Sequence, residues 1–191
     1  GYMVTFTAPV NWNGTETLTF YVEDESGETA FDSVSVVVTP VNDTPTIDLP
    51  ESFTFAEDGI LLDNFSQYIG DIDEDVLTLT ASGMENIIVS IDGFQVMIGS
   101  VQDWNGSETV TFTVNDNQNR AIASDDVEVI VTPLEDPPLA DDQEVTTDED
   151  VAVEIVLTGS DPDLEDEISF VLLTDPADGF LTGEVPYLIY T

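Results

Sequence analysis

The sequence contains no histidine, no cysteine and no lysine, and Arg120 is its only basic residue. Without histidine or cysteine the chain has no Ser-His or Cys-His nucleophile, no thiolate metal site and no disulfide bond. The absence of lysine also excludes Schiff-base chemistry and lysine–asparagine isopeptide cross-links. Against this single basic residue stand 41 Asp and Glu, so the 191 residues have a formal net charge of -40. Nucleic acids and anionic membrane surfaces require Lys and Arg for binding, and we therefore expect cations or neutral surfaces as partners.

The acidic composition is not that of a disordered tail. Hydrophobic residues make up 41% of the chain, and ten of them are Phe, so the chain can bury a core. Long apolar runs are also missing, which argues against insertion into a membrane. The start Gly1-Tyr2-Met3 resembles neither an initiator nor a signal peptide. We therefore expect a folded piece of a longer chain.

The sequence repeats itself. Residues 11–24 (NWNGTETLTFYVED) match residues 103–116 (DWNGSETVTFTVND), which sets a period of about 92 residues. The same period relates Glu57 to Glu149. Further matching segments are 31–45 with 124–138, 70–82 with 159–173, and 94–100 with 186–191. These matches predict one complete unit between two incomplete ones.

The apolar residues alternate with Thr, as in Val110, Phe112 and Val114, which is typical of half-buried strands. About seven short strands in roughly 90 residues predict an all-β fold of tandem seven-stranded antiparallel Greek-key sandwiches. Only residues 61–70 lack alternation, and there we expect a short helical turn. The predicted boundaries are a C-terminal half-repeat at 1–41, a linker at 42–45, a complete repeat at 46–133, a linker at 134–138 and an N-terminal half-repeat at 139–191.

The two half-repeats are complementary, because residues 139–191 supply the first strands of a unit and residues 1–41 the last. Each half alone leaves an apolar face, such as Val34, Val36 and Val38, open to water. Two explanations are open: the sequence is an excerpt of a continuous repeating chain, or neighbouring copies complete each other head to tail. Both predict that the halves lie in completed sandwiches in the native assembly.

Acidic residues recur at the predicted ends of the strands and in the linkers. Stacked units bring these positions together, where unneutralised carboxylates repel one another strongly. An oxygen-only ligand set favours calcium. Two other interpretations are open: most carboxylates form a solvated surface, or the source is a halophile that needs no specific cation. With so many carboxylates, a pair at the spacing of a glycosidase indicates nothing.

Three segments together resemble the bacterial cadherin-like and immunoglobulin-like tandem repeats of large surface proteins. They are TFYVED with VSVVVTPVNDTP, TFTVND with VEVIVTPLEDPP, and LTGSDPD. The resemblance implies calcium at the linkers. Carried over by position, the ligands of the first linker are Asn42, Asp43, Asp71, Asp73 and Asp116, and those of the second are Glu57, Glu135, Asp136, Asp161 and Asp163. The second linker departs from the family pattern: Glu135 replaces an Asn, and only Asp103 stands in for a second acidic motif.

Two other recurring features have structural and functional interpretations. Trp12 and Trp104 beside Asn-Gly turns indicate packing at the sandwich edge rather than sugar-stacking platforms. The sequons at Asn13, Asn64 and Asn105 fit turn chemistry better than glycan attachment.

The sequence thus favours a non-catalytic, calcium-stiffened segment of a long extracellular repeat protein at the cell surface, either an adhesin stalk or a surface fibre. Its expected partners are adjacent repeats of the same or neighbouring chains, with a surface or glycan ligand bound by other domains. The alternative is a set of spacer repeats in a large secreted enzyme or carbohydrate-binding protein.

Overall fold

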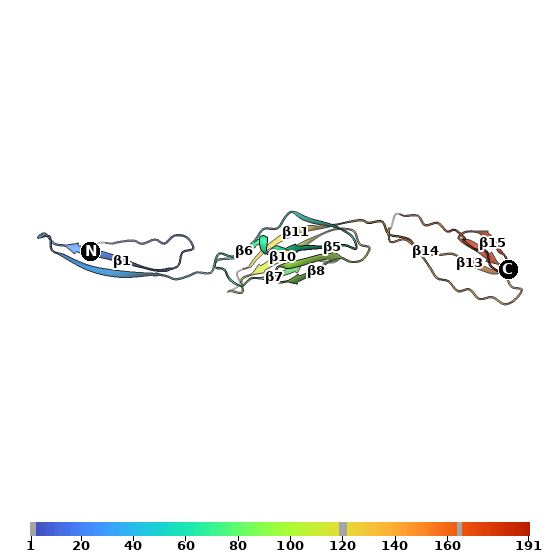
Figure 1. Ribbon diagram of the computed structural model, residues 1–191, viewed down its shortest axis with the longest axis horizontal. Coiled ribbons are helices and arrows are strands. Elements are labelled where there is room, and N and C mark those ends of the chain that lie inside the picture. The colour runs from blue at the N-terminus through green and yellow to red at the C-terminus, as the bar shows by residue number, and fades with distance from the viewer. Residues whose placement is uncertain (1–2, 119–121, 164–165) are drawn as a thin grey trace.

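The computed structural model describes residues 3–118, 122–163 and 166–191 and places three units in a line (Figure 1). Arg120 and Tyr2 lie outside the described residues. The central unit has two facing sheets, the N-terminal unit has a two-stranded sheet, and the C-terminal unit has a three-stranded sheet and a short two-stranded one. The prediction of an all-β fold with one complete and two partial sandwiches is confirmed.

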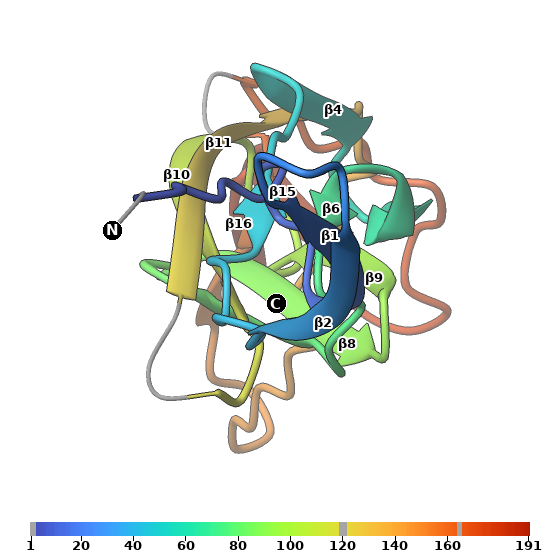
Figure 2. The ribbon, with the colours of Figure 1, turned by 90° about the vertical axis from the view of Figure 1, so that its left-hand side faces the viewer.

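The central unit consists of a four-stranded and a three-stranded sheet. The larger sheet has the order β4 (Ser52–Ala56), β11 (Ile122–Thr132), β10 (Gly106–Asn115) and β7 (Thr78–Ser82). The smaller sheet has the order β5 (Ile60–Asn64), β9 (Gln95–Ser100) and β8 (Ile87–Asp92). In a view down the long axis of the molecule, β10 and β11 lie on one side of the central unit and β8 and β9 lie on the opposite side (Figure 2).

The strand count and one strand direction differ from the prediction. The described part of the central unit has nine strands rather than seven, because β3 (Thr46–Ile47) and β6 (Ile69–Gly70) form a short additional pair. Pro50 interrupts the first strand, since it has no N–H to donate. Before Pro50 the chain pairs with β6, and after it β4 pairs with β11 in parallel. The expected helical turn in 61–70 is present as the 3₁₀ turn η1 (Phe65–Gln67), which follows β5.

The core of the central unit lies between the two sheets. Val110, Phe112 and Val114 of β10 are fully buried, as are Val127 and Val129 of β11. Phe112 packs against Phe65 of η1 with ring centroids 4.8 Å apart. Each such side chain contributes about 1.5–3 kcal/mol when it leaves water, so this unit is the main source of stability in the chain.

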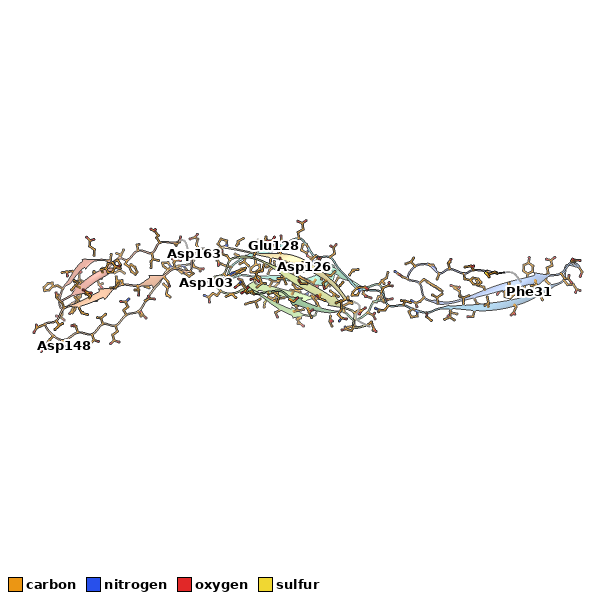
Figure 3. The ribbon with its side chains drawn as sticks, turned by 180° about the vertical axis from the view of Figure 1, so that it is seen from behind. Phe31, Asp103, Asp126, Glu128, Asp148 and Asp163 are labelled. Atoms are coloured by element: carbon orange, nitrogen blue, oxygen red, sulfur yellow. The ribbon has the colours of Figure 1, made fainter. Side chains whose placement is uncertain are left out.

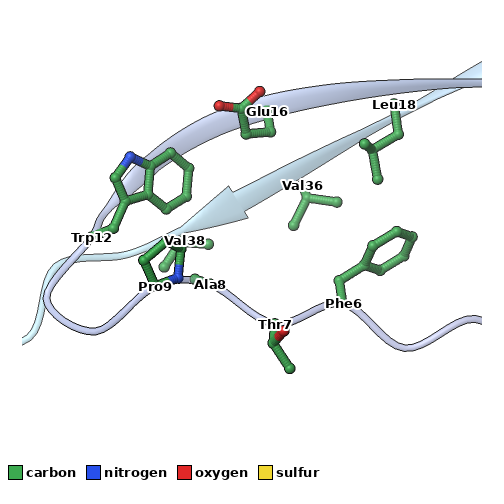
Figure 4. A pocket seen from close by; sticks show the side chains of 9 residues that line it. All are labelled: Phe6, Thr7, Ala8, Pro9, Trp12, Glu16, Leu18, Val36 and Val38. Carbon is green, nitrogen blue, oxygen red and sulfur yellow. The ribbon is translucent and has the colours of Figure 1, made fainter.

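The N-terminal unit is a hairpin of β1 (Gly14–Glu23) and β2 (Thr29–Val38), which correspond to β10 and β11. Among the described residues, no second sheet covers the hairpin. Leu18 and Phe20, the counterparts of the buried Val110 and Phe112, are 37% and 50% exposed. An open cavity of about 320 Å³ lies between this hairpin and the segment before it (Figure 4), and its lining includes Phe6, Trp12, Leu18, Val36 and Val38.

The C-terminal unit contains counterparts of the other strands of the central unit. Its three-stranded sheet, in the order β13 (Val153–Val156), β16 (Tyr187–Tyr190) and β15 (Leu181–Glu184), corresponds to β5-β9-β8. A short pair, β12 (Leu139–Ala140) with β14 (Gly159–Ser160), corresponds to β3 with β6. Residues 144–148 and 169–173 correspond to β4 and β7 but form no strand. In the central unit, β4 pairs with β11 and β7 pairs with β10.

Glu108 of β10 stabilises the turn between β7 and β8 through hydrogen bonds. Its carboxylate accepts hydrogen bonds from the backbone N–H groups of Glu85, Asn86 and Ile87 at 2.9, 2.8 and 3.2 Å. Burial raises the pKa of Glu108, but these hydrogen bonds and one from the Asn86 side chain outweigh it and hold the pKa below its usual value. The ionised form therefore stabilises the fold.

We expect Glu108→Gln to lower the unfolding free energy by about 1–3 kcal/mol at neutral pH, because its amide group faces backbone donors. Because the folded pKa is lowered, the wild-type advantage is complete above the ordinary Glu pKa of about 4.3. It should disappear as the pH falls through the folded pKa. Denaturant unfolding of both chains between pH 3 and 7 measures this. Glu128→Gln, on the exposed face of β11, is the matched control; an equal loss there would contradict the role of Glu108.

Candidate cation sites at the linkers

All five residues predicted at the first linker lie together. The Asn42 side chain donates to Asp116 Oδ2 at 2.7 Å, and the backbone N–H of Asp43 donates to Asp73 Oδ2 at 2.7 Å. Asp71 Oδ1 in turn accepts from the backbone N–H of Asp73 at 2.9 Å. The linker thus connects two separate loops of the central unit. Asp116 is only 1% exposed, and such deep burial is rare for a carboxylate.

A sixth residue, Asp75, completes this group as its fifth carboxylate. Asp71, Asp73 and Asp75 each place one oxygen within 4.8 Å of the others. Among the described residues, Asp71 Oδ2 is the buried side-chain oxygen that accepts no hydrogen bond. Desolvation, together with the charges of Asp71, Asp116 and Asp73, raises the pKa of Asp75. A buried oxygen without a donor, surrounded by like charges, fits the ligand set of a hard cation.

The second linker repeats the central contact of the first. The backbone N–H of Asp136 donates to Asp163 Oδ2 at 2.8 Å, and that of Asp163 donates to Asp161 Oδ1 at 3.0 Å. These are the counterparts of the Asp43–Asp73 and Asp73–Asp71 bonds. Asp103 of the central unit and Asp163 of the next unit lie at the same junction (Figure 3).

The carboxylates of the second linker form two adjacent groups. Asp58, Asp103 and Asp136 form one, and Glu135, Asp163 and Asp166 form the other, each with oxygens within 4.8 Å. Desolvation and then the charges of Asp58, Asp103, Asp163 and Glu57 raise the pKa of Asp136. Of the predicted residues, Asp136 belongs to the first group and Glu135 and Asp163 to the second, whereas Glu57 and Asp161 belong to neither.

Glu57 lies beneath the second junction and is 2% exposed. Its carboxylate accepts a hydrogen bond from the backbone N–H of Leu134 at 2.7 Å and two from the Asn105 side chain at 3.3 Å. These bonds fix the linker to the end of the central unit. In the described structure Glu57 therefore holds the linker in place.

Three of these carboxylates were not predicted: Asp58, Asp75 and Asp166. Asp75 extends the Asp71-x-Asp73 pattern by one step, and that spacing was the available signal. Asp58 follows Glu57 directly, but its left-handed backbone (φ 59°) turns it toward Asp103, which also has a left-handed φ of 56°. Asn11, the counterpart of Asp103, has a φ of 59° and lines a cavity with Asp43 and Asp73 at the first linker. The two sites therefore differ in charge at this position.

Both tryptophans and two of the sequon asparagines make packing or hydrogen-bond contacts within the fold. The Trp104 ring packs against the core and over Gly106, where an added Cβ would lie 3.0 Å from it; Trp12 repeats this contact with Gly14 at 3.1 Å. The edge-packing interpretation therefore agrees with the structure. Asn64 Oδ1 accepts from the backbone N–H of Ser66, and Asn105 donates to Glu57. Asn64 thus stabilises a local turn, whereas Asn105 holds Glu57, which is 48 residues away along the chain.

Comparisons with known proteins give no family. No family model matches the chain, and no curated protein sequence matches it. Among solved structures, an endo-fucoidan hydrolase of glycoside hydrolase family 107 matches 96% of this chain and 30% of its own, at 17% identity and a TM-score of 0.44. The titin I-band fragment I67–I69 matches 92% of this chain and 63% of its own, at 16% identity and a TM-score of 0.36.

These two similarities are low, and the chain spans less than a third of the hydrolase that it matches. Neither assigns an activity. In the described parts of the chain, no helix has the length and apolar character needed to cross a membrane.

Proposed function

We propose that this chain is a non-catalytic segment of a long extracellular repeat protein, stiffened by calcium at the junctions between its units. The supporting observation is that carboxylates from separate loops, and at the second junction from successive units, converge on each linker. As the stalk of an adhesin or the body of a surface fibre, such a chain gains reach with each added unit. Adjacent repeats are then its main partners, and any surface or glycan ligand is bound by other domains.

Electrostatics provides the physical reason for a cation. Two unit charges 4 Å apart at an effective dielectric constant of 20 repel by about 4 kcal/mol. Each junction holds a group of three carboxylates within 4.8 Å. Desolvation, followed by this repulsion, raises the pKa of both Asp75 and Asp136. A divalent cation bound between the carboxylates would replace their mutual repulsion with attraction to the ion.

Calcium fits these donors better than other ions. The site residues offer carboxylate, amide and backbone oxygens, and the chain has no His or Cys for softer metals. Calcium accepts six to eight oxygens in a flexible geometry, which suits a set drawn from two loops and a linker. At the first linker Asn42, Asp43, Asp71, Asp73, Asp75 and Asp116 would hold the ion. At the second, Asp58, Asp103, Asp136 and Asp163 would do so, with Glu57 and Asp161 beside them.

Stiffening follows from where the ligands come from. An ion bound to Asp43 of the linker and to Asp73 of the central unit restricts rotation about the linker. Small-angle X-ray scattering of the chain with calcium, and with a chelator at equal ionic strength, tests this. We expect a longer maximum dimension and a narrower distance distribution with calcium. Equal profiles under both conditions would contradict stiffening by calcium.

A further inference from the structure

The smaller sheet of the central unit has an unpaired edge at β8. In the order β5-β9-β8, no strand of the described residues pairs with the far side of β8. Both sheets of this unit are present, so the ends of the sequence do not create this edge. We infer that β8 is a docking edge for an extended segment of another protein, with an apolar and a basic side chain, which pairs with β8 as a fourth strand. This inference goes beyond calcium binding and does not depend on it.

Backbone hydrogen-bonding groups of β8 are open along this edge. The carbonyl group of Asn86, just before β8, accepts a hydrogen bond from the backbone N–H of Val101 at 2.8 Å, so it faces the side of β9. Backbone groups of successive residues point to opposite sides of a strand. Because the register of β8 with β9 is regular, those of Val89 and Ile91 face the open edge. A further strand would find N–H donors and carbonyl acceptors there.

The sequence of β8 leaves this edge unprotected. Residues 87–91 are all Ile or Val except Ser90. The segment contains no charge, no Pro and, in its pairing with β9, no bulge. Charges, Pro residues and bulges are the features with which proteins usually prevent a strand edge from pairing with other chains. The edge of β8 is therefore accessible to a partner strand.

The outward face of the sheet beside this edge is apolar. Ile88 of β8 and Ile60 of β5 flank Gly99 of β9 in one row of paired residues, and they are 52% and 61% exposed. In the next row Leu62, opposite Met97, is 70% exposed. Exposed apolar patches often mark interaction sites. An apolar side chain of the partner opposite Ile88 would extend this patch and cover its edge.

A fourth strand would also extend the core of the unit. Val89 and Ile91 lie on the core face of β8 and pack against the buried residues, but both are only half-buried. A β-branched side chain of the partner opposite each of them would cover what is still open to water. The partner segment therefore carries β-branched residues at alternate positions, with the remaining side chains on the outward face.

Charge determines which partner fits. Side chains alternate between the two faces of a strand, so the exposed Asp92 lies on the same outward face as Ile88. A Lys or Arg opposite Asp92 forms a favourable cross-strand pair, whereas an acidic residue there is repelled. The net charge of -40 likewise disfavours a second copy of this chain. The occupant that fits is an extended segment with a basic side chain opposite Asp92 and an apolar one opposite Ile88.

The test uses the whole chain and a synthetic peptide, Ac-Lys-Val-Thr-Val-Leu-Thr-amide, whose Lys lies opposite Asp92 and whose Leu lies opposite Ile88 in an antiparallel pair. The buffer contains 0.5 M NaCl and a chelator, because salt screens unspecific attraction and the chelator separates docking from calcium binding. In nuclear magnetic resonance spectra, we expect saturable shifts of the Val89 and Ile91 amides and slower hydrogen exchange at both. No saturable shift at millimolar peptide, or shifts at other strand edges only, would overturn the inference. If these amides shift with protein concentration alone, the occupant is a second copy, and the choice of partner is overturned.

Two variants separate docking at β8 from attraction to the net charge. Val89→Pro removes an N–H that faces the open edge, where Pro is tolerated, and should weaken peptide binding at least tenfold; thermal unfolding checks that it is folded. Asp92→Lys, which does not depend on that check, should prefer a peptide with Glu in place of Lys. Glu128→Lys, on the exposed face of β11, is the matched control and should keep the wild-type preference. An unchanged preference in Asp92→Lys, or a reversed one in Glu128→Lys, would refute docking at β8.

Discussion

Calcium at about 100 times its dissociation constant is expected to raise the unfolding free energy of the central unit by about 2.7 kcal/mol for each occupied site. The central unit contributes carboxylates to both junctions, including Asp71 and Asp73 at one end and Asp58 and Asp103 at the other. Both sites require the folded unit to bring these residues together, so binding favours the folded state. For a unit of about 90 residues, 1 kcal/mol shifts the melting temperature by about 4–8 °C. We therefore expect a rise of more than about 10 °C.

The measurement is thermal unfolding followed by circular dichroism, with calcium and with a chelator, at equal ionic strength. Sodium chloride at molar concentration is the control for simple screening of the -40 charge. If sodium chloride alone reproduces the whole rise, the acidic residues act as a halophilic surface. Identical melting curves with calcium and with chelator would exclude a stabilising calcium site.

The second large effect is expected from Asp71→Ala and Asp73→Ala. Asp73 joins the central unit to the linker through the backbone N–H of Asp43, and Asp71 orients Asp73. Substitution of groups that only orient metal ligands costs about 10–100-fold in affinity, and we expect the loss of a ligand itself to cost at least as much. Calcium affinity at the first linker should therefore fall at least tenfold, while the second linker keeps its site.

Neither substitution should unfold the central unit, because its core lies between the sheets and away from this loop. Without calcium, the variants should even melt at or above the wild-type temperature, since one repelling charge is gone. Glu128→Ala removes the same charge from the flank of the central unit (Figure 3) and should leave calcium affinity unchanged. Equal affinity in Asp73→Ala and the wild type would show that Asp73 is only a surface charge.

The sequence predicted the fold through local signals. The Thr and Val alternation marks β10, and the repeat places β1 at the same position in the preceding unit. Strand direction was harder, because the parallel pairing of β4 with β11 depends on how Pro50 redirects the chain between two sheets. That change is a tertiary event, and alternation alone does not encode it.

In the candidate sites, too, some residues could be predicted from local sequence and others depend on the tertiary structure. Asn42, Asp43 and Asp73 could be named because the linker and the Asp71-x-Asp73 segment resemble the motifs of cadherin-like repeats. Asp58 could not be named, because its position beside Asp103 and Asp136 depends on a left-handed backbone and on how the units meet. In a chain with 41 acidic residues, only the folded structure separates clustered carboxylates from solvated ones.

Isothermal titration calorimetry of the chain with calcium, in 150 mM NaCl, tests the central claim most directly. Saturable binding with at least one ion at each linker is predicted, and Asp73→Ala should lose the ion at the first linker. Magnesium should bind more weakly, because it demands a rigid octahedral set that these loops do not provide. A titration that shows only the heat of dilution would contradict calcium binding at the linkers, and with it the account of how this chain is stiffened.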